Sequence, residues 1–222
     1  MGTNYLPDSK SWTEITRDER FYCAELYRVL SLSKKNIGEF IKLIKNKCEP
    51  KNPLPENNDW EIGFEVCFYR DILHHKGISI KNYPIDCEYI NHKKERISLT
   101  RFPVKRTFDL CLFQDGYLII IEAKAAEGYK NKQLDDFKAD MAIFKSEANT
   151  LFEDNTPKIL FLGLHSSKYS PKLETLKVFD LDDFDTKQQS ITWCDLHRSF
   201  SDHSQLFSQA DKLYSSKSKP NC

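Results

Sequence analysis

Two apolar segments joined by a short turn restrict the fold of this chain more than any other part of the sequence. They cover residues 107–113 and 117–124, with Gln-Asp-Gly between them. The dipeptide Asp115-Gly116 is a strong hairpin signal, because a type I′ turn needs a positive φ at both central positions. We therefore predict an antiparallel hairpin whose second strand is buried in the protein core.

The register of this hairpin brings two carboxylates together. If Gln114 and Tyr117 close the turn, counting back along both strands places Asp109 opposite Glu122, with Cβ atoms about 4.5–5.5 Å apart. Lys124 follows on the same face as Glu122. Like charges that face each other destabilise a strand pair, so a positive group must lie between them. Lys124, a hard divalent cation (Mg²⁺ or Mn²⁺), or both can supply this charge.

This arrangement has two interpretations. A lysine and a divalent cation that share one pair of carboxylates describe a catalytic site. The alternative is a structural Asp–Lys–Glu cluster at the end of a sheet, with no catalytic role. The hairpin alone leaves both open.

Helical and extended patterns alternate along the rest of the chain. The segment TRDE predicts a helix start, with Thr16 as N-cap and Glu19 as its capping-box partner. The Pro- and Asn-rich run 49–59 predicts a break between a helical N-terminal extension, residues 1–50, and a core, residues 60–214. The apolar spacing predicts helices at about 16–33, 37–47, 60–75, 131–149 and 195–214, and strands at 78–90, 107–113, 117–124, 158–164 and 175–179. These elements predict an α/β fold with a mixed central sheet flanked by helices.

Composition excludes several classes of protein. Apolar residues make up 40% of the chain and charged residues 30%, which is typical of a globular domain. The formal net charge is zero, so any nucleic-acid surface must be a local patch. No apolar run approaches the length of a membrane span, and the seven cysteines include no CxxC pair. We therefore expect a cytoplasmic protein that contacts no membrane.

The hairpin residues resemble a known signature. TFD, a turn and then IIIEAK are similar to the D-x(n)-E-x-K motif of the PD-(D/E)xK, or restriction-endonuclease-like, nuclease superfamily. The matching positions are Asp109, Glu122 and Lys124, and the resemblance covers roughly residues 60–165. Phe108 stands where the family name has proline. In this family the motif lies on an antiparallel pair at the centre of a mixed sheet, so the resemblance implies a restriction-endonuclease-like fold.

The resemblance also implies roles for the motif residues. Asp109, Glu122 and the carbonyl of Ala123 would bind one or two Mg²⁺ or Mn²⁺ ions, which activate water and neutralise the scissile phosphate. Lys124 would orient or activate that water and stabilise the developing charge. Gln133 resembles a glutamine that some branches carry in the next helix, although Phe137 replaces the tyrosine of the QxxxY branch.

A further glutamate is expected upstream. Family members carry a helical glutamate that completes the metal shell, and Glu65, in the predicted helix 60–75, matches that placement. The alternative is a surface carboxylate that pairs with Tyr69 or Arg70. Glu25 on the first helix is a rival for the role, whereas Glu19 is expected to act only as a cap.

The expected partner is nucleic acid. A basic run at 92–106 precedes the hairpin, and its Lys and Arg side chains would neutralise phosphates. We expect a Mg²⁺-dependent endonuclease acting on double-stranded DNA in restriction, phage defence or repair, as a homodimer or within a larger defence complex. The alternatives are an RNase and a non-catalytic member of the same fold that binds nucleic acid or protein.

Overall fold

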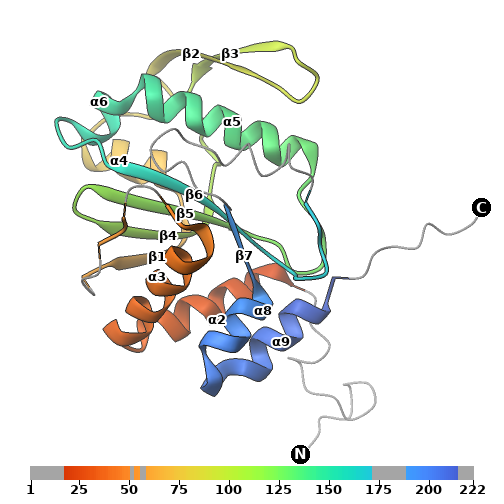
Figure 1. Ribbon diagram of the computed structural model, residues 1–222. Helices are drawn as coiled ribbons and strands as arrows, with labels where there is room; N and C mark the ends of the chain where they lie inside the picture. Colours follow the sequence, from red (N-terminus) through yellow and green to blue (C-terminus); the bar gives the residue numbers. More distant parts are fainter. Residues whose placement is uncertain (1–17, 51–52, 56–58, 172–188, 215–222) are drawn as a thin grey trace, which may run out of the picture.

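A five-stranded mixed sheet forms the centre of the part of the chain that the structure describes (Figure 1). The computed structural model describes residues 18–50, 53–55, 59–171 and 189–214. The strand order is β1-β4-β5-β6-β7. β1, β4 and β5 pair antiparallel, whereas β5, β6 and β7 run parallel. The strands are β1 (Glu61–Val66), β4 (Phe108–Gln114), β5 (Tyr117–Ala123), β6 (Lys158–His165) and β7 (Ser190–Thr192).

Helices cover both faces of this sheet (Figure 1). One layer packs against Ile119 and Ile121 of β5, and the other against Leu118 and Ile120. The first layer contains α2 (Glu19–Ser31), α3 (Lys34–Cys48), α8 (Trp193–Ser199) and α9 (Ser204–Lys212). The second contains α4 (Phe68–His75), α5 (Asn131–Ser146) and α6 (Ala148–Phe152). The predicted α/β fold with a mixed sheet flanked by helices is thus confirmed at this level.

A separate two-stranded sheet lies outside the central one. It consists of β2 (Pro84–Ile90) and β3 (Arg96–Arg101), and it packs on α5 (Figure 1). The sequence analysis predicted β2 within a longer strand, but it placed no strand at β3 or β7. The predicted strand 175–179 lies outside the described residues.

The central hairpin forms with the predicted register. Gln114 pairs with Tyr117, and the ladder continues to Leu110 opposite Ile121. The predicted type I′ turn is wrong, because φ is positive at Gly116 but not at Asp115. Glycine takes the left-handed conformation at little cost, and one such residue is enough to reverse the chain here.

The predicted helix at 60–75 is wrong in its first half. Residues 61–66 form β1, which pairs along β4, and only Phe68–His75 is helical. Ile62 and Phe64 contact the α2/α3 layer, while Val66 packs in the opposite layer. The change of side occurs at Glu65, whose φ is 52°. The predicted helix had joined Ile62 and Val66 of this strand to Tyr69 and Leu73 of α4, which follow at helical spacing.

The described part of the N-terminal extension shares a core with the sheet. Leu26 of α2 and Phe40 of α3 are fully buried in the same apolar cluster as Leu110 and Ile121. Asp18 is the N-cap of α2 and accepts a hydrogen bond from the Arg20 N–H, so the first helix begins at Glu19. The predicted N-cap, Thr16, lies outside the described residues. None of the described helices is long and apolar enough to cross a membrane.

Candidate active site

The two predicted carboxylates lie where β4 begins and β5 ends. The ladder of paired residues ends at Leu110–Ile121, and the next residue on each strand is Asp109 on β4 and Glu122 on β5. The N–H of Ala123 donates to Oδ2 of Asp109 at 2.8 Å, which fixes that carboxylate against β5. Glu122 is buried at 7% exposure. The predicted pairing thus places both acids beside each other at one end of a buried hairpin.

Lys124 is the cation that contacts this pair. Its ammonium donates to Oε1 of Glu122 at 3.0 Å and to the carbonyl of Ala123 at 2.7 Å. Its backbone is fixed as well, because its N–H donates to the Leu164 carbonyl and its carbonyl accepts from the Trp193 indole. With 5% exposure, this lysine is held inside the protein rather than lying on its surface.

Glu19 contributes a third carboxylate that the sequence analysis did not assign to the site. Its Oε1 accepts from the Lys124 ammonium at 2.8 Å, and its Oε2 accepts from the Ala125 N–H at 3.2 Å. Because Asp18 caps α2, the side chain of Glu19 is available to leave the helix end and reach β5. The expectation that Glu19 acts only as a cap is therefore wrong.

The other candidate glutamates have different surroundings. Glu65 lies on β1, not on a helix, and its carboxylate pairs with Arg20 at 3.5 Å. In the described part of the chain, no hydrogen bond joins Glu65 to Asp109 or Glu122. Glu25 pairs with Arg28 one turn along α2. Of these three glutamates, Glu19 is the one that hydrogen-bonds to Lys124 within the described residues.

The first turn of α5 supports Glu122 from the other side. Gln133 donates to Oε1 of Glu122 at 3.4 Å, while its own Oε1 accepts from the Lys130 N–H. The Tyr129 hydroxyl donates to the Glu122 carbonyl at 3.0 Å. A Cβ at Gly163 would lie 2.6 Å from that hydroxyl, so the tyrosine needs a glycine on β6. The structure thus brings Gln133 to the predicted site and adds Tyr129.

The site holds three carboxylates against one ammonium. Burial raises the pKa of Asp109 to about 7; the charge of Glu122 adds to this, while Lys124 opposes it. Burial also raises the pKa of Glu19, in spite of Lys124. Burial would lower the pKa of Lys124, but Glu122, Glu19 and Asp109 together outweigh it, so this pKa is raised. The lysine remains charged, and the cluster keeps an excess of negative charge.

This donor set suits a hard divalent cation in its chemistry. Mg²⁺ and Mn²⁺ prefer carboxylate and carbonyl oxygens, which Asp109, Glu122 and Ala123 supply together. The Lys124 ammonium contacts two of these groups. Within the described ranges, no three His, Cys, Asp or Glu side chains converge as a formed metal site. A cation would therefore compete with Lys124 for the same oxygens, and the excess negative charge would favour its binding.

A second buried charged cluster lies nearby, between β4 and α5. Arg106 Nε donates to Asp140 at 2.7 Å, and the Tyr69 hydroxyl donates to the same carboxylate at 2.9 Å. The guanidinium also lies over the rings of Phe108 and Phe137. Arg106 belongs to the basic run that was expected to contact DNA, but its side chain is only 15% exposed. Its charge serves a buried ion pair instead.

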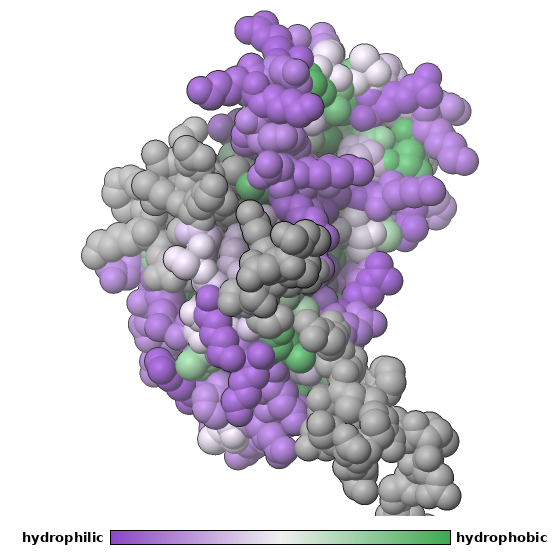
Figure 2. Space-filling view, turned by 90° about the vertical axis from the view of Figure 1, so that its right-hand side faces the viewer, coloured by the Kyte–Doolittle hydropathy of each residue, from purple (hydrophilic) through white to green (hydrophobic). Residues whose placement is uncertain are grey.

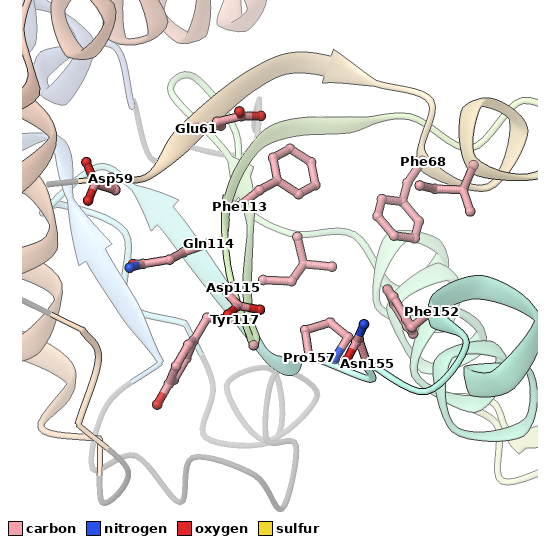
Figure 3. A pocket seen from close by; sticks show the side chains of 13 residues that line it. Asp59, Glu61, Phe68, Phe113, Gln114, Asp115, Tyr117, Phe152, Asn155 and Pro157 are labelled. Carbon is pink, nitrogen blue, oxygen red and sulfur yellow. The ribbon is translucent and has the colours of Figure 1, made fainter. Parts of the chain in front are cut away.

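A hollow of 450 Å³ lies at the opposite end of the central hairpin (Figure 3). Tyr117 lines it, and Glu122 lies five residues further along the same strand, which corresponds to about 17 Å. The hollow is therefore not part of the carboxylate cluster. Its lining also includes Asp59, Glu61, Phe68, Phe113 and Phe152.

Comparisons with protein-family models, with curated proteins and with solved structures found no match to this chain. A functional hypothesis therefore depends on the geometry of the chain's own residues. Of the residues around Lys124, the sequence analysis missed Glu19, Tyr129 and Trp193. The nearest available signal for Glu19 was an Asp immediately before it, which can cap the helix in its place.

Proposed function

We propose that this protein is a Mg²⁺- or Mn²⁺-dependent nuclease of the restriction-endonuclease-like fold, which cleaves DNA internally in restriction, phage defence or repair. The observation that supports this most directly is the gathering of three carboxylates, Glu19, Asp109 and Glu122, around the buried ammonium of Lys124. A purely structural ion pair needs one acid for one base. Surplus acids at neighbouring strand ends favour a site that takes up a cation.

Each group has a role in this proposal. Asp109, Glu122 and the Ala123 carbonyl would hold the ion, which when bound supplies an activated water and neutralises phosphate charge. Lys124 would orient the attacking water and stabilise the negative charge that develops on the phosphate. Gln133 keeps Glu122 oriented toward the site. Glu19, in place of Glu65, is the third carboxylate.

A cleavage assay tests the proposal. Wild-type protein and Lys124→Ala are incubated with supercoiled plasmid, linear duplex, single-stranded DNA and RNA, in Mg²⁺, Mn²⁺ or chelator. We expect wild type to nick and linearise plasmid only with metal, and Lys124→Ala to be slower by about 10²–10³-fold, which is the usual loss for one charge-stabilising donor. Calorimetric Mn²⁺ titration should show that this variant still binds metal, because the lysine is not a ligand.

Other outcomes contradict the proposal. Cleavage of RNA alone would indicate an RNase, and no cleavage with any metal would indicate a non-catalytic protein. A drop in Mn²⁺ affinity in Lys124→Ala as large as in Asp109→Ala would mean that the role given to the lysine is wrong.

Two glutamates on the same helix provide a matched test for the third carboxylate. Glu19→Gln and Glu25→Gln each remove one negative charge from α2, but only Glu19 contacts Lys124. We expect Glu19→Gln to reduce both cleavage and Mn²⁺ affinity, and Glu25→Gln to leave both unchanged. Equal effects would show that Glu19 acts only through the net charge of the helix.

A further inference from the structure

The β2–β3 hairpin presents an ordered tip rather than a loose loop. The side chain of Asn91 accepts hydrogen bonds from the N–H groups of Lys93 and Glu95, and its own amide donates to the Glu95 carboxylate. Lys94 has a φ of 65°, an uncommon conformation for a residue other than glycine. The four residues of the turn, 92–95, are thus held in one shape by the side chain that precedes them.

A contact between distant residues attaches this tip to α5. The backbone N–H of His92 donates to Asp135 at 2.7 Å, and Nδ1 of its ring lies 2.5 Å from the other oxygen of that carboxylate. Asp135 lies two residues after Gln133, which donates to Glu122. Two helical residues lie about 3 Å apart along the axis and project to nearly opposite sides of the helix, so Asp135 holds the tip on the side away from Gln133. The tip is therefore anchored to the same turn of α5 that supports the candidate active site.

The basic run divides into two groups in the structure. Arg106 is buried with Asp140, and Arg96 pairs with Glu88 on the neighbouring strand. Lys93 and Lys94, at the tip, are exposed. Figure 2 faces the side toward which β5 runs, and hydrophilic side chains project from its upper part, where the hairpin and α5 lie. Arg101 and Lys105, further along the run, are exposed as well, so Lys93 and Lys94 are distinguished by their place on a fixed turn.

We propose that this hairpin tip binds the phosphate backbone of duplex DNA beside the cleavage site, with Lys93 and Lys94 as the contacts and the His92–Asp135 contact as the positioning element. The proposal takes its ligand from the proposed nuclease function. A two-stranded ribbon has the width that the major groove of DNA admits. Single strands, in contrast, are usually bound by exposed aromatic rings, and residues 90–96 include no Phe, Tyr or Trp.

The first test measures binding in chelator, so that nothing is cleaved. A fluorescent DNA duplex is titrated with wild type, with Lys93→Ala/Lys94→Ala, and with the control Lys35→Ala/Lys42→Ala, which removes the same charge from exposed positions on α3. We expect the tip variant to bind more weakly and to lower the slope of log K against log salt by about 0.9 for each phosphate that it no longer neutralises. The control should keep the wild-type slope.

The second test separates positioning from net charge. Asp135→Ala removes a negative charge, so electrostatics alone predicts tighter binding to DNA. We expect the opposite: because the tip loses its anchor, affinity falls several-fold while both lysines are still present. The melting temperature of the same variant shows whether the helix stays folded. His92→Ala removes the ring contact with Asp135 but keeps the backbone N–H contact, so it should reproduce part of the loss without changing the charge of α5.

The outcomes distinguish this proposal from the nuclease assignment. An unchanged salt slope in the tip variant, or tighter binding by Asp135→Ala, overturns the proposed role of the hairpin tip as a clamp on duplex DNA. It leaves the nuclease assignment intact if plasmid is still cleaved. The clamp also fails if single strands or RNA depend on the two lysines while duplex does not. A wild-type protein that binds duplex with the expected lysine dependence but never cleaves it would support the clamp and refute the nuclease.

Discussion

Two buried charged clusters lie close together in this molecule and differ in their charge balance. Around Asp140, one arginine meets one carboxylate, and a tyrosine hydroxyl occupies the other carboxylate oxygen. Around Lys124, one ammonium meets the carboxylates of Glu19 and Glu122, and a third, Asp109, lies close enough to help raise the pKa of the lysine. The first cluster is balanced by its own residues, whereas the second is not.

A perturbed pKa alone does not tell these clusters apart. Burial raises the pKa of Asp140 to about 6, although Arg106 and Tyr69 lower it. Burial raises the pKa of Asp109 to about 7, and here Glu122 raises it further. Structural ion pairs and functional sites both shift pKa values. The informative difference is that Asp140 has a full partner among its neighbours, while the acids around Lys124 share one.

The largest effect we expect is the loss of stability when the balanced cluster is broken. Asp140→Ala leaves Arg106 buried without its partner, which typically costs about 3–5 kcal/mol, or a melting temperature lower by roughly 10 °C in a chain of this size. Thermal melts with and without Mn²⁺ measure it. Cleavage below the melting temperature should remain close to wild type.

A paired replacement checks that interpretation. Arg106→Met combined with Asp140→Leu removes both charges from the core and should recover much of the lost stability, as hydrophobic replacement of buried ion pairs often does. If Asp140→Ala is folded but does not cleave, the balanced cluster has a role in the reaction and the contrast between the clusters fails.

The sequence predicted the part of the site that is local. The β4–β5 register follows from a two-residue turn and a period of two, so Asp109, Glu122 and Lys124 could be placed before the structure was known. Glu19 could not, because its contact with Lys124 joins residues 105 positions apart. Such a contact depends on how α2 packs across the sheet, and a single sequence carries no local pattern for that packing.

The errors in the predicted fold have the same origin. Residues 61–66 lie on an edge strand of the described sheet, where the apolar pattern changes side at Glu65. The helical spacing came from combining Ile62 and Val66 of β1 with Tyr69 and Leu73 of α4. Arg106 was predicted as an exposed member of a basic run, because composition does not show that Asp140, 34 residues later, would bury it.

The next largest effect is a dependence of stability on pH that Asp109 contributes. Its pKa is about 7 in the folded protein against 3.8 ordinarily, so the folded state holds a proton that the unfolded state releases. This contribution to stability is complete below pH 3.8 and is lost as pH rises through 7. We expect wild type to lose on the order of 2 kcal/mol from this group between pH 5 and 8.

Asp109→Asn isolates this contribution. The variant cannot titrate at this position, so its melting temperature should fall less than that of wild type over the same pH range. Asp140 titrates in the same direction, with a folded pKa of about 6, and should account for the fall that remains. Parallel pH profiles for wild type and variant would mean that Asp109 ionises normally and that the cluster carries no excess charge.

The smallest effect concerns the unbalanced cluster without metal. Glu122→Gln removes one of three negative charges at nearly constant shape, while Glu19 still contacts Lys124. Because the charge of Glu122 raises the pKa of Asp109, removing that charge should reduce the electrostatic repulsion between the two side chains. We expect the metal-free variant to be more stable than wild type by about 0.5–1 kcal/mol, the usual size of a cross-strand pair energy. The gain should be larger at pH 8, where Asp109 is ionised, than at pH 6.

Bound metal should reverse this order of stability, so that wild type melts above Glu122→Gln. Ligands that bind only the folded state stabilise it by mass action, so wild type should gain melting temperature in Mn²⁺ and Glu122→Gln should gain much less, while its cleavage activity is abolished. Two melting curves for each protein, one in chelator and one in Mn²⁺, measure both effects. If the variant melts lower than wild type in chelator and both respond equally to Mn²⁺, then Lys124 already balances its carboxylates. The cluster would then be structural, like the one around Asp140, and the proposed nuclease would no longer have a physical basis.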